Sequence, residues 1–275
     1  MYDYRLGKQK AEKYVIGLCK QLDIKVELNN SIIDLSHEVD FTMKYGKADV
    51  LQSLFDANDP FLSSPVSFGV NHNIPGLRVE LASNYGNHKS SIDSPGFIEA
   101  PEISFSNEIT FYRKEAVIMF NNGDIANFSR CYRAFLQSSV SLVECFLHRY
   151  VFHLKTLIPS TQEYKNTEVL DSRKSLEDRL EAWIQTYATH KSKEFMNSRS
   201  RSKFIELKNQ RNCIVHPSQP TIPYSTKCVI KYLNFAQEGV GGLLADLRSF
   251  SGYTENIGFI RQIKTEPEIR ILKKS

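Results

Sequence analysis

Three polar residues within LKNQRNCIVHP, residues 207–217, carry side chains that could act on a phosphate ester. Arg211 offers a planar fork of hydrogen-bond donors that matches phosphate oxygens. Asn212 can orient a neighbour or donate to such an oxygen, and His216 can move a proton near neutral pH. No carboxylate cluster accompanies them, so the pattern favours phosphate chemistry that needs no metal ion and no cofactor.

Helical spacing places Arg211 among apolar residues. If this part of the chain is a helix and Phe204 defines 0°, Leu207 lies at about 300° and Arg211 at about 340°. Val215, at about 20°, extends the same apolar stripe. Burying a guanidinium without a partner costs several kcal/mol, so an arginine here needs a carboxylate, an anion or another protein surface.

Both charged residues of the motif also have structural explanations. Arg211 could form a buried ion pair with Glu144, which lies at the edge of the apolar stripe of an earlier predicted helix. His216 could interact with the dipole at the C-terminal end of its own helix. Pro217 disfavours the helical conformation for His216, so this side chain is also free to turn towards the arginine. The sequence leaves these explanations open.

The stretch from Arg211 to His216 reads R-N-C-I-V-H, which resembles the R-x4–6-H motif of HEPN domains (higher eukaryotes and prokaryotes nucleotide-binding). An earlier segment, SSVSLVECFLHRY at residues 138–150, is similar to the small-residue-then-glutamate pattern of many such domains. The resemblance covers about residues 124–250 and implies a helical bundle. In many HEPN proteins the motif is a metal-independent ribonuclease site at a homodimer interface.

On this resemblance, Arg211, Asn212 and His216 are the expected catalytic residues, with Glu144 in support. His216 would act as general base or acid, Arg211 would stabilise negative charge on the phosphate, and Asn212 would orient one of its oxygens. The implied protein is a homodimeric RNA-cleaving toxin or defence effector, with an antitoxin or regulatory partner. The alternative is a non-catalytic HEPN module that dimerises and binds a nucleotide, RNA or a protein.

A basic run precedes the motif in RSRSK and contains Arg199, Arg201 and Lys203. It could bind an RNA backbone, or it could be the solvated start of a helix. Phe195 and Tyr224 could stack on bases, although packing in the core is the favoured interpretation of both aromatic rings.

Amphipathic helices are the elements that must position these residues. Apolar residues recur at helical spacing over residues 124–154, 172–188, 202–216 and 226–249. Asp124 has the type and position of an N-cap, and Ser175 with Asp178 resembles a capping box. Four such helices with short to moderate connections predict a helical bundle over residues 122–250.

Residues 1–121 follow a different pattern. A helix is predicted over 8–22, and β-like runs separated by turn residues follow at 24–28, 66–70, 77–82, 102–106, 109–113 and 116–120. This half is therefore predicted to be an α+β region, of unknown function. Residues 251–275 alternate on both sides of the four-residue turn TEPE, which predicts a β-hairpin.

Composition restricts the class of protein. The net charge of +4 permits nucleic-acid binding without arguing for it. The five cysteines are scattered and form no C-x-x-C pair, which indicates reduced thiols in the cytosol and no zinc site. No signal-peptide pattern and no apolar run of roughly 18–20 residues is present, so we expect a cytoplasmic protein without a membrane partner.

Overall fold

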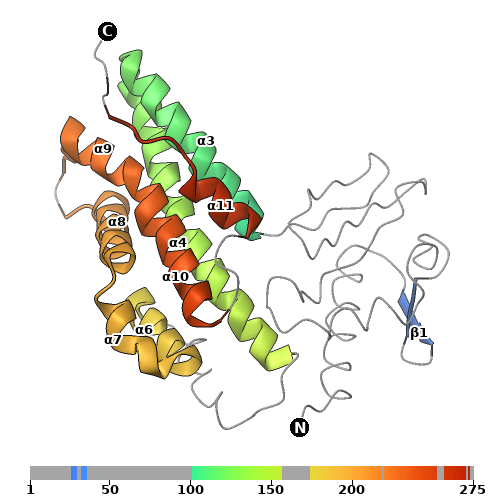
Figure 1. Cartoon of the computed structure of the whole chain (residues 1–275). Helices are drawn as coiled ribbons and strands as arrows, with labels where there is room; N and C mark the ends of the chain where they lie inside the picture. Colours follow the sequence, from blue (N-terminus) through green and yellow to red (C-terminus); the bar gives the residue numbers. More distant parts are fainter. Residues whose placement is uncertain are drawn as a thin grey trace. The chain divides into compact units, whose positions relative to one another are not determined.

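The computed structural model describes residues 26–29, 32–35, 101–156, 174–218, 220–252, 257–270 and 272 (Figure 1). The chain divides into two compact units. One comprises Met1–Ala100 and Arg149–Thr167, and the other comprises Pro101–His148 and Glu168–Ser275.

In the first unit, the described strands are β1 (Val26–Asn29) and β2 (Ile32–Leu35). They pair antiparallel, with Val26 opposite Leu35 and Asn29 opposite Ile32. The strand predicted at 24–28 is thus confirmed over most of its length. The predicted helix at 8–22 and the predicted strands at 66–70 and 77–82 lie outside the described residues.

From residue 101 onwards, the described part of the chain is an all-α helical bundle. Its elements are α3 (Pro101–Asn121), α4 (Ile125–Thr156), α6 (Leu176–Tyr187), the 3-10 turn η2 (Thr189–Lys191), α7 (Ser192–Met196), α8 (Arg199–Val215), α9 (Thr226–Phe235), the π-helical turn η3 (Ala236–Gly241), α10 (Gly242–Phe250) and α11 (Gly258–Lys264). The four predicted helices correspond to α4, α6, α8 and the continuous helix 226–250, and all four are confirmed.

Local hydrogen bonds explain where the helices begin. Asp124 Oδ1 accepts from the Asn127 amide at 3.0 Å, and Ser175 Oγ accepts from the Asp178 amide at 3.2 Å. Each bond satisfies one of the amide groups that a helix start leaves unpaired. The N-cap at Asp124 and the Ser175 half of the predicted capping box are therefore confirmed. Gly123, with φ of +74°, makes the turn between α3 and α4, a conformation in which a β-carbon is strained.

Helix α3 corrects the prediction of three strands at 102–106, 109–113 and 116–120. Its buried residues have the alternating four- and three-residue spacing of one helix face, but three of the five are polar: Glu102, Ser106, Ile109, Arg113 and Ala116. Meanwhile Phe111 is 57% exposed and Ile118 is 36% exposed. Residue hydrophobicity therefore does not reveal this face, and the helical region begins at residue 101 instead of 122.

Helix α11 corrects the predicted β-hairpin. Phe259, Ile260 and Ile263 are buried at helical spacing, and α11 packs against α3 and the π-helical turn. Residues 265–270 then leave the helix and continue along the bundle without secondary structure (Figure 1). The alternation that suggested strands is thus an effect of a short helix followed by an irregular segment.

Glycines at the π-helical turn let three helices approach one another closely. A β-carbon on Gly239 would lie 3.3 Å from the Phe204 nitrogen of α8, and one on Gly242 would lie 3.2 Å from Cβ of Ser200. A β-carbon on Gly241 would lie 2.8 Å from Cγ of Lys264, at the end of α11. The EGVGG sequence therefore serves packing, and it fixes α8, the helix that carries the arginine–histidine motif.

Candidate functional site

Arg211 is half-buried in the last turns of α8. Its Nη1 donates to the Asn212 side-chain oxygen at 3.0 Å, while its Nε is buried and has no hydrogen-bond partner. A guanidinium carries five N–H donors. The Nη donors that Asn212 does not use can therefore bind water, an anion or another protein surface, whereas the buried Nε cannot.

The buried residues of α8 are Ser200, Phe204, Leu207 and Ile214, so the predicted stripe is confirmed at Phe204 and Leu207. At the last turn, Arg211 lies about 60° away from Ile214 around the helix axis. Val215 is 43% exposed, although it was expected to be buried. Arg211 thus flanks the core and is not enclosed by it.

Glu144 does not pair with this arginine. It lies half-buried on α4, and within the described residues no ion pair joins Arg211 to Glu144 or to any other carboxylate. The structure therefore contradicts the explanation of Arg211 as one half of a buried ion pair inside its own bundle.

His216 is the residue at which α8 stops. Its backbone N–H makes the last helical hydrogen bond, to the Asn212 carbonyl at 2.8 Å, and its backbone has turned out of the helix, with φ −124° and ψ 67°. Pro217 follows, as expected for a helix end. The His216 side chain is exposed. An exposed imidazole at the end of the helix is accessible to a ligand and can exchange protons with it.

The basic run does not join the motif. Arg199 and Arg211 are twelve residues apart on one helix, which separates them by about 18 Å along its axis. Arg199 forms an ion pair with Glu238 at 3.2 Å, and Lys203 pairs with the same carboxylate. Arg201 donates to the Met196 carbonyl at 3.3 Å. Glu238 therefore offsets part of the positive charge that was expected to bind RNA.

Aromatic packing supports the chain that follows the motif. The Tyr224 ring makes edge-to-face contacts with Phe128 and Tyr132 of α4, each with 5.8 Å between ring centroids. Phe195 is fully buried and contacts Phe250. The core-packing interpretation of Tyr224 and Phe195 is thus confirmed. The Tyr224 contacts attach the segment after His216 to α4.

Tyr132 is a feature that the sequence did not single out. It is fully buried, and burial raises the pKa of this phenol far above its ordinary value, although a contact with the Gln210 side chain opposes the shift. Nearby Tyr232 and Tyr224 raise the pKa further. The hydroxyl therefore stays protonated at neutral pH. Its place on the apolar stripe of α4 was evident from the sequence, but its neighbours Tyr224 and Tyr232 were not.

Cysteines and possible metal ligands are dispersed in the described part of the chain. No group of three or more His, Cys, Asp or Glu side chains there is placed to hold a metal ion. Cys213, within the motif, is exposed. No helix among the described residues is both long enough and apolar enough to cross a bilayer.

No protein-family model, curated protein or solved structure matches the chain.

Proposed function

We propose that the protein is a metal-independent endoribonuclease of the HEPN type. The observation that carries this proposal is the Arg211 guanidinium, which has no carboxylate partner among the described residues, close in sequence to an exposed His216 at the end of the same helix. One group can neutralise a phosphate, and the other can move a proton.

In the proposed reaction, the ribose 2′-oxygen attacks the adjacent phosphorus and the bond from phosphorus to the 5′-oxygen breaks. The products are a 2′,3′-cyclic phosphate and a 5′-hydroxyl. His216 accepts the proton of the 2′-hydroxyl or donates one to the leaving 5′-oxygen. Arg211 stabilises the charge that develops on the phosphorus oxygens, and Asn212, already bonded to Arg211, holds the guanidinium in place.

A two-fold dimer through α8 would complete this site. Val215 exposes an apolar side chain one helical turn after Arg211, and a second copy packed on this face would cover it. Isologous symmetry would bring two copies of His216 to one groove, so that one imidazole acts as base and the other as acid. Toxin or defence activity, regulated by a partner protein, is the role we propose for such an enzyme.

The test of catalysis is cleavage of varied RNAs in the presence of a chelator. Intact protein should yield 2′,3′-cyclic phosphate ends, and Arg211→Ala and His216→Ala should each lower the rate by about 10²-fold or more. His190→Ala, which changes an exposed histidine on η2, is the matched control and should retain full activity. Equal rates for all variants would contradict the proposal.

The second candidate is a non-catalytic HEPN module, and exposed Val215 is the observation that favours it. An apolar residue beside the motif suits a protein interface as well as a catalytic groove. Val215→Asp should weaken self-association at least tenfold, about 1.4 kcal/mol, as measured by sedimentation. Ile125→Asp, an exposed apolar control on α4, should not. Self-association without RNA cleavage would support this module over the nuclease.

A further inference from the structure

The bundle binds part of its own chain through main-chain contacts. Arg113 Nη2 donates to the Pro267 carbonyl at 2.6 Å, and Gln237 Nε2 donates to the Glu266 carbonyl. Asn234 makes two bonds to one residue: its Nδ2 donates to the Ile269 carbonyl at 2.8 Å, and its Oδ1 accepts from the Ile269 amide at 2.9 Å. Side chains of the helices thus bind the backbone of residues 266–269 at three points.

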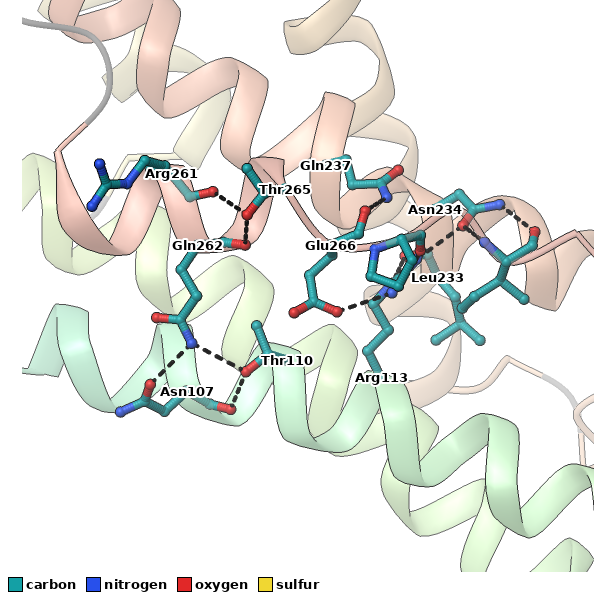
Figure 2. A network of polar contacts seen from close by, with 12 residues as sticks. Asn107, Thr110, Arg113, Leu233, Asn234, Gln237, Arg261, Gln262, Thr265 and Glu266 are labelled. Atoms are coloured by element: carbon teal, nitrogen blue, oxygen red, sulfur yellow. Dashed lines mark hydrogen bonds and ion pairs between the residues drawn. The ribbon is translucent and has the colours of Figure 1, made fainter.

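Figure 2 shows that these side chains belong to one network in which Arg113 is central. Arg113 is only 3% exposed, and its Nε donates to the Leu233 carbonyl of α9 at 2.9 Å. Its Nη2 also donates to Asn234 Oδ1 at 3.1 Å. Two of the contacts that orient the site therefore come from α3 and α9 alone and do not depend on residues 266–269.

The contacts define a direction and a preferred ligand sequence. Gln237 meets residue 266 and Asn234 meets residue 269, so the bound segment runs antiparallel to α9. Arg113 Nη1 forms an ion pair with Glu266 at 3.2 Å, which selects an acidic side chain at that position. Leu272, 7% exposed, adds a buried apolar residue further along. Main-chain bonds supply affinity and side-chain contacts supply specificity, as in other peptide-recognition modes.

We propose that Arg113, Asn234 and Gln237 form a peptide-binding site, which residues 266–269 occupy in cis and which the same segment of a second copy of this chain can occupy in trans. The second copy is the occupant we assign because it carries the one sequence whose fit the structure displays. Exchange of an identical element between copies needs no new interface chemistry. This proposal does not depend on the arginine–histidine motif or on RNA cleavage.

Occupancy in cis determines how the site responds to ligand. A tethered segment has an effective concentration on the order of millimolar, so a free peptide at micromolar concentration competes poorly with it. Weakening the bound segment without changing the site should therefore increase binding in trans. Ile269→Pro does this, because proline removes the amide that donates to Asn234 and leaves Arg113, Asn234 and Gln237 unchanged.

The first experiment measures fluorescence polarisation of a labelled peptide of residues 264–272, KTEPEIRIL. The Ile269→Pro chain should bind this probe at least tenfold more tightly than the unaltered chain. A probe that itself carries Ile269→Pro should bind neither chain. Adding Asn234→Ala to the Ile269→Pro chain should abolish the gain. An Ile269→Pro chain that keeps its circular dichroism spectrum and does not gain affinity for the probe would overturn the proposal.

The second experiment tests the second copy as the source of the segment. Tagged Ile269→Pro chain, with an intact site, is mixed with untagged Asn234→Ala chain, with an intact segment, and co-capture is measured. Both chains carry Val215→Asp, to weaken any contact through α8. The control is a mixture of tagged and untagged Ile269→Pro chains, in which neither partner has an intact segment. Capture of the Asn234→Ala chain should be at least threefold greater than capture in this control. Capture at the level of this control, with the probe still bound, would refute exchange between copies.

Discussion

Two arginines, Arg113 on α3 and Arg211 on α8, show how differently one side chain is used in two regions of the bundle. Arg113 is buried and donates to Leu233, Asn234, Glu266 and Pro267. Arg211 is half-buried, donates to its neighbour Asn212, and keeps an unpaired Nε. An arginine whose donors are nearly all used stabilises the fold, whereas the Nη donors that Arg211 does not share with Asn212 can bind another group. The contrast separates the structural from the candidate functional arginine.

The largest effect we expect is on folding, from Arg113→Ala. Removing one partner of a buried charge network deprives the Glu266 carboxylate and the Pro267 carbonyl of their donor, and it should lower the free energy of unfolding by about 3–5 kcal/mol. Urea denaturation of this variant beside Arg130→Ala, an exposed control on α4, measures the difference. A loss below about 1 kcal/mol would show that Arg113 is not the structural member of the pair.

Arg211→Ala should change stability little and RNA cleavage strongly. Its free energy of unfolding should stay within about 0.5 kcal/mol of the unaltered chain, since few contacts are lost. RNA cleavage should fall about 10²-fold, which corresponds to about 2.7 kcal/mol of transition-state stabilisation. Measuring both quantities on one preparation sharpens the comparison. If stability fell as much as in Arg113→Ala, the two arginines would have the same structural role.

Asn234→Ala tests the network around Arg113 at a neighbouring position. It leaves the Ile269 amide and carbonyl without partners, so we expect a loss of about 1–3 kcal/mol. Hydrogen exchange of the Ile269 amide should accelerate accordingly. Asn234→Asp keeps both acceptor contacts but sets a carboxylate oxygen against the Ile269 carbonyl, so it should also lower stability. Slow exchange at Ile269 in the alanine variant would mean that other contacts hold this segment.

The smallest effect concerns the cap of α4 and its dependence on pH. Hydrogen bonds from the Asn127 backbone and side chain lower the pKa of Asp124 below its ordinary value of 3.8. The cap therefore stabilises the fold fully above the unfolded pKa and is lost as pH falls through the lower folded pKa. The stability difference between the unaltered chain and Asp124→Ala should shrink below about pH 4. A difference that persists at pH 2 would contradict a role for the charged carboxylate.

The sequence was sufficient where an apolar stripe marks the buried face. Helix α4 was predicted within two residues because aromatic and aliphatic side chains recur along it, with Asp124 ahead of them. Helix α3 was missed because Glu102, Ser106 and Arg113 occupy its buried face, where residue type misleads. Burial of polar residues depends on partners that are distant in the chain, which local patterns cannot reveal.

The candidate site shows the same division. The end of α8 at His216 followed from Pro217 and from the helical spacing before it. The sequence could not predict which arginine would have its hydrogen-bond donors occupied, because the partners of Arg113 lie 120 to 154 positions later in the chain. The absence of a Glu144 contact to Arg211 likewise depends on how α4 and α8 are placed within the bundle.

The π-helical turn at Ala236–Gly241 changes the direction in which side chains point between the first and second halves of the helix from 226 to 250. A π turn holds one residue more than an α turn would, so side chains beyond it are rotated by about 100° relative to an uninterrupted helix. Ahead of this turn, Asn234 faces the network of Arg113; after it, Gly242 faces Ser200 of α8. Deleting one residue there would restore a regular helix and turn one half away from its neighbours. The number of residues in this turn thus determines the rotation about the helix axis between the half that contacts the Arg113 network and the half that packs on α8.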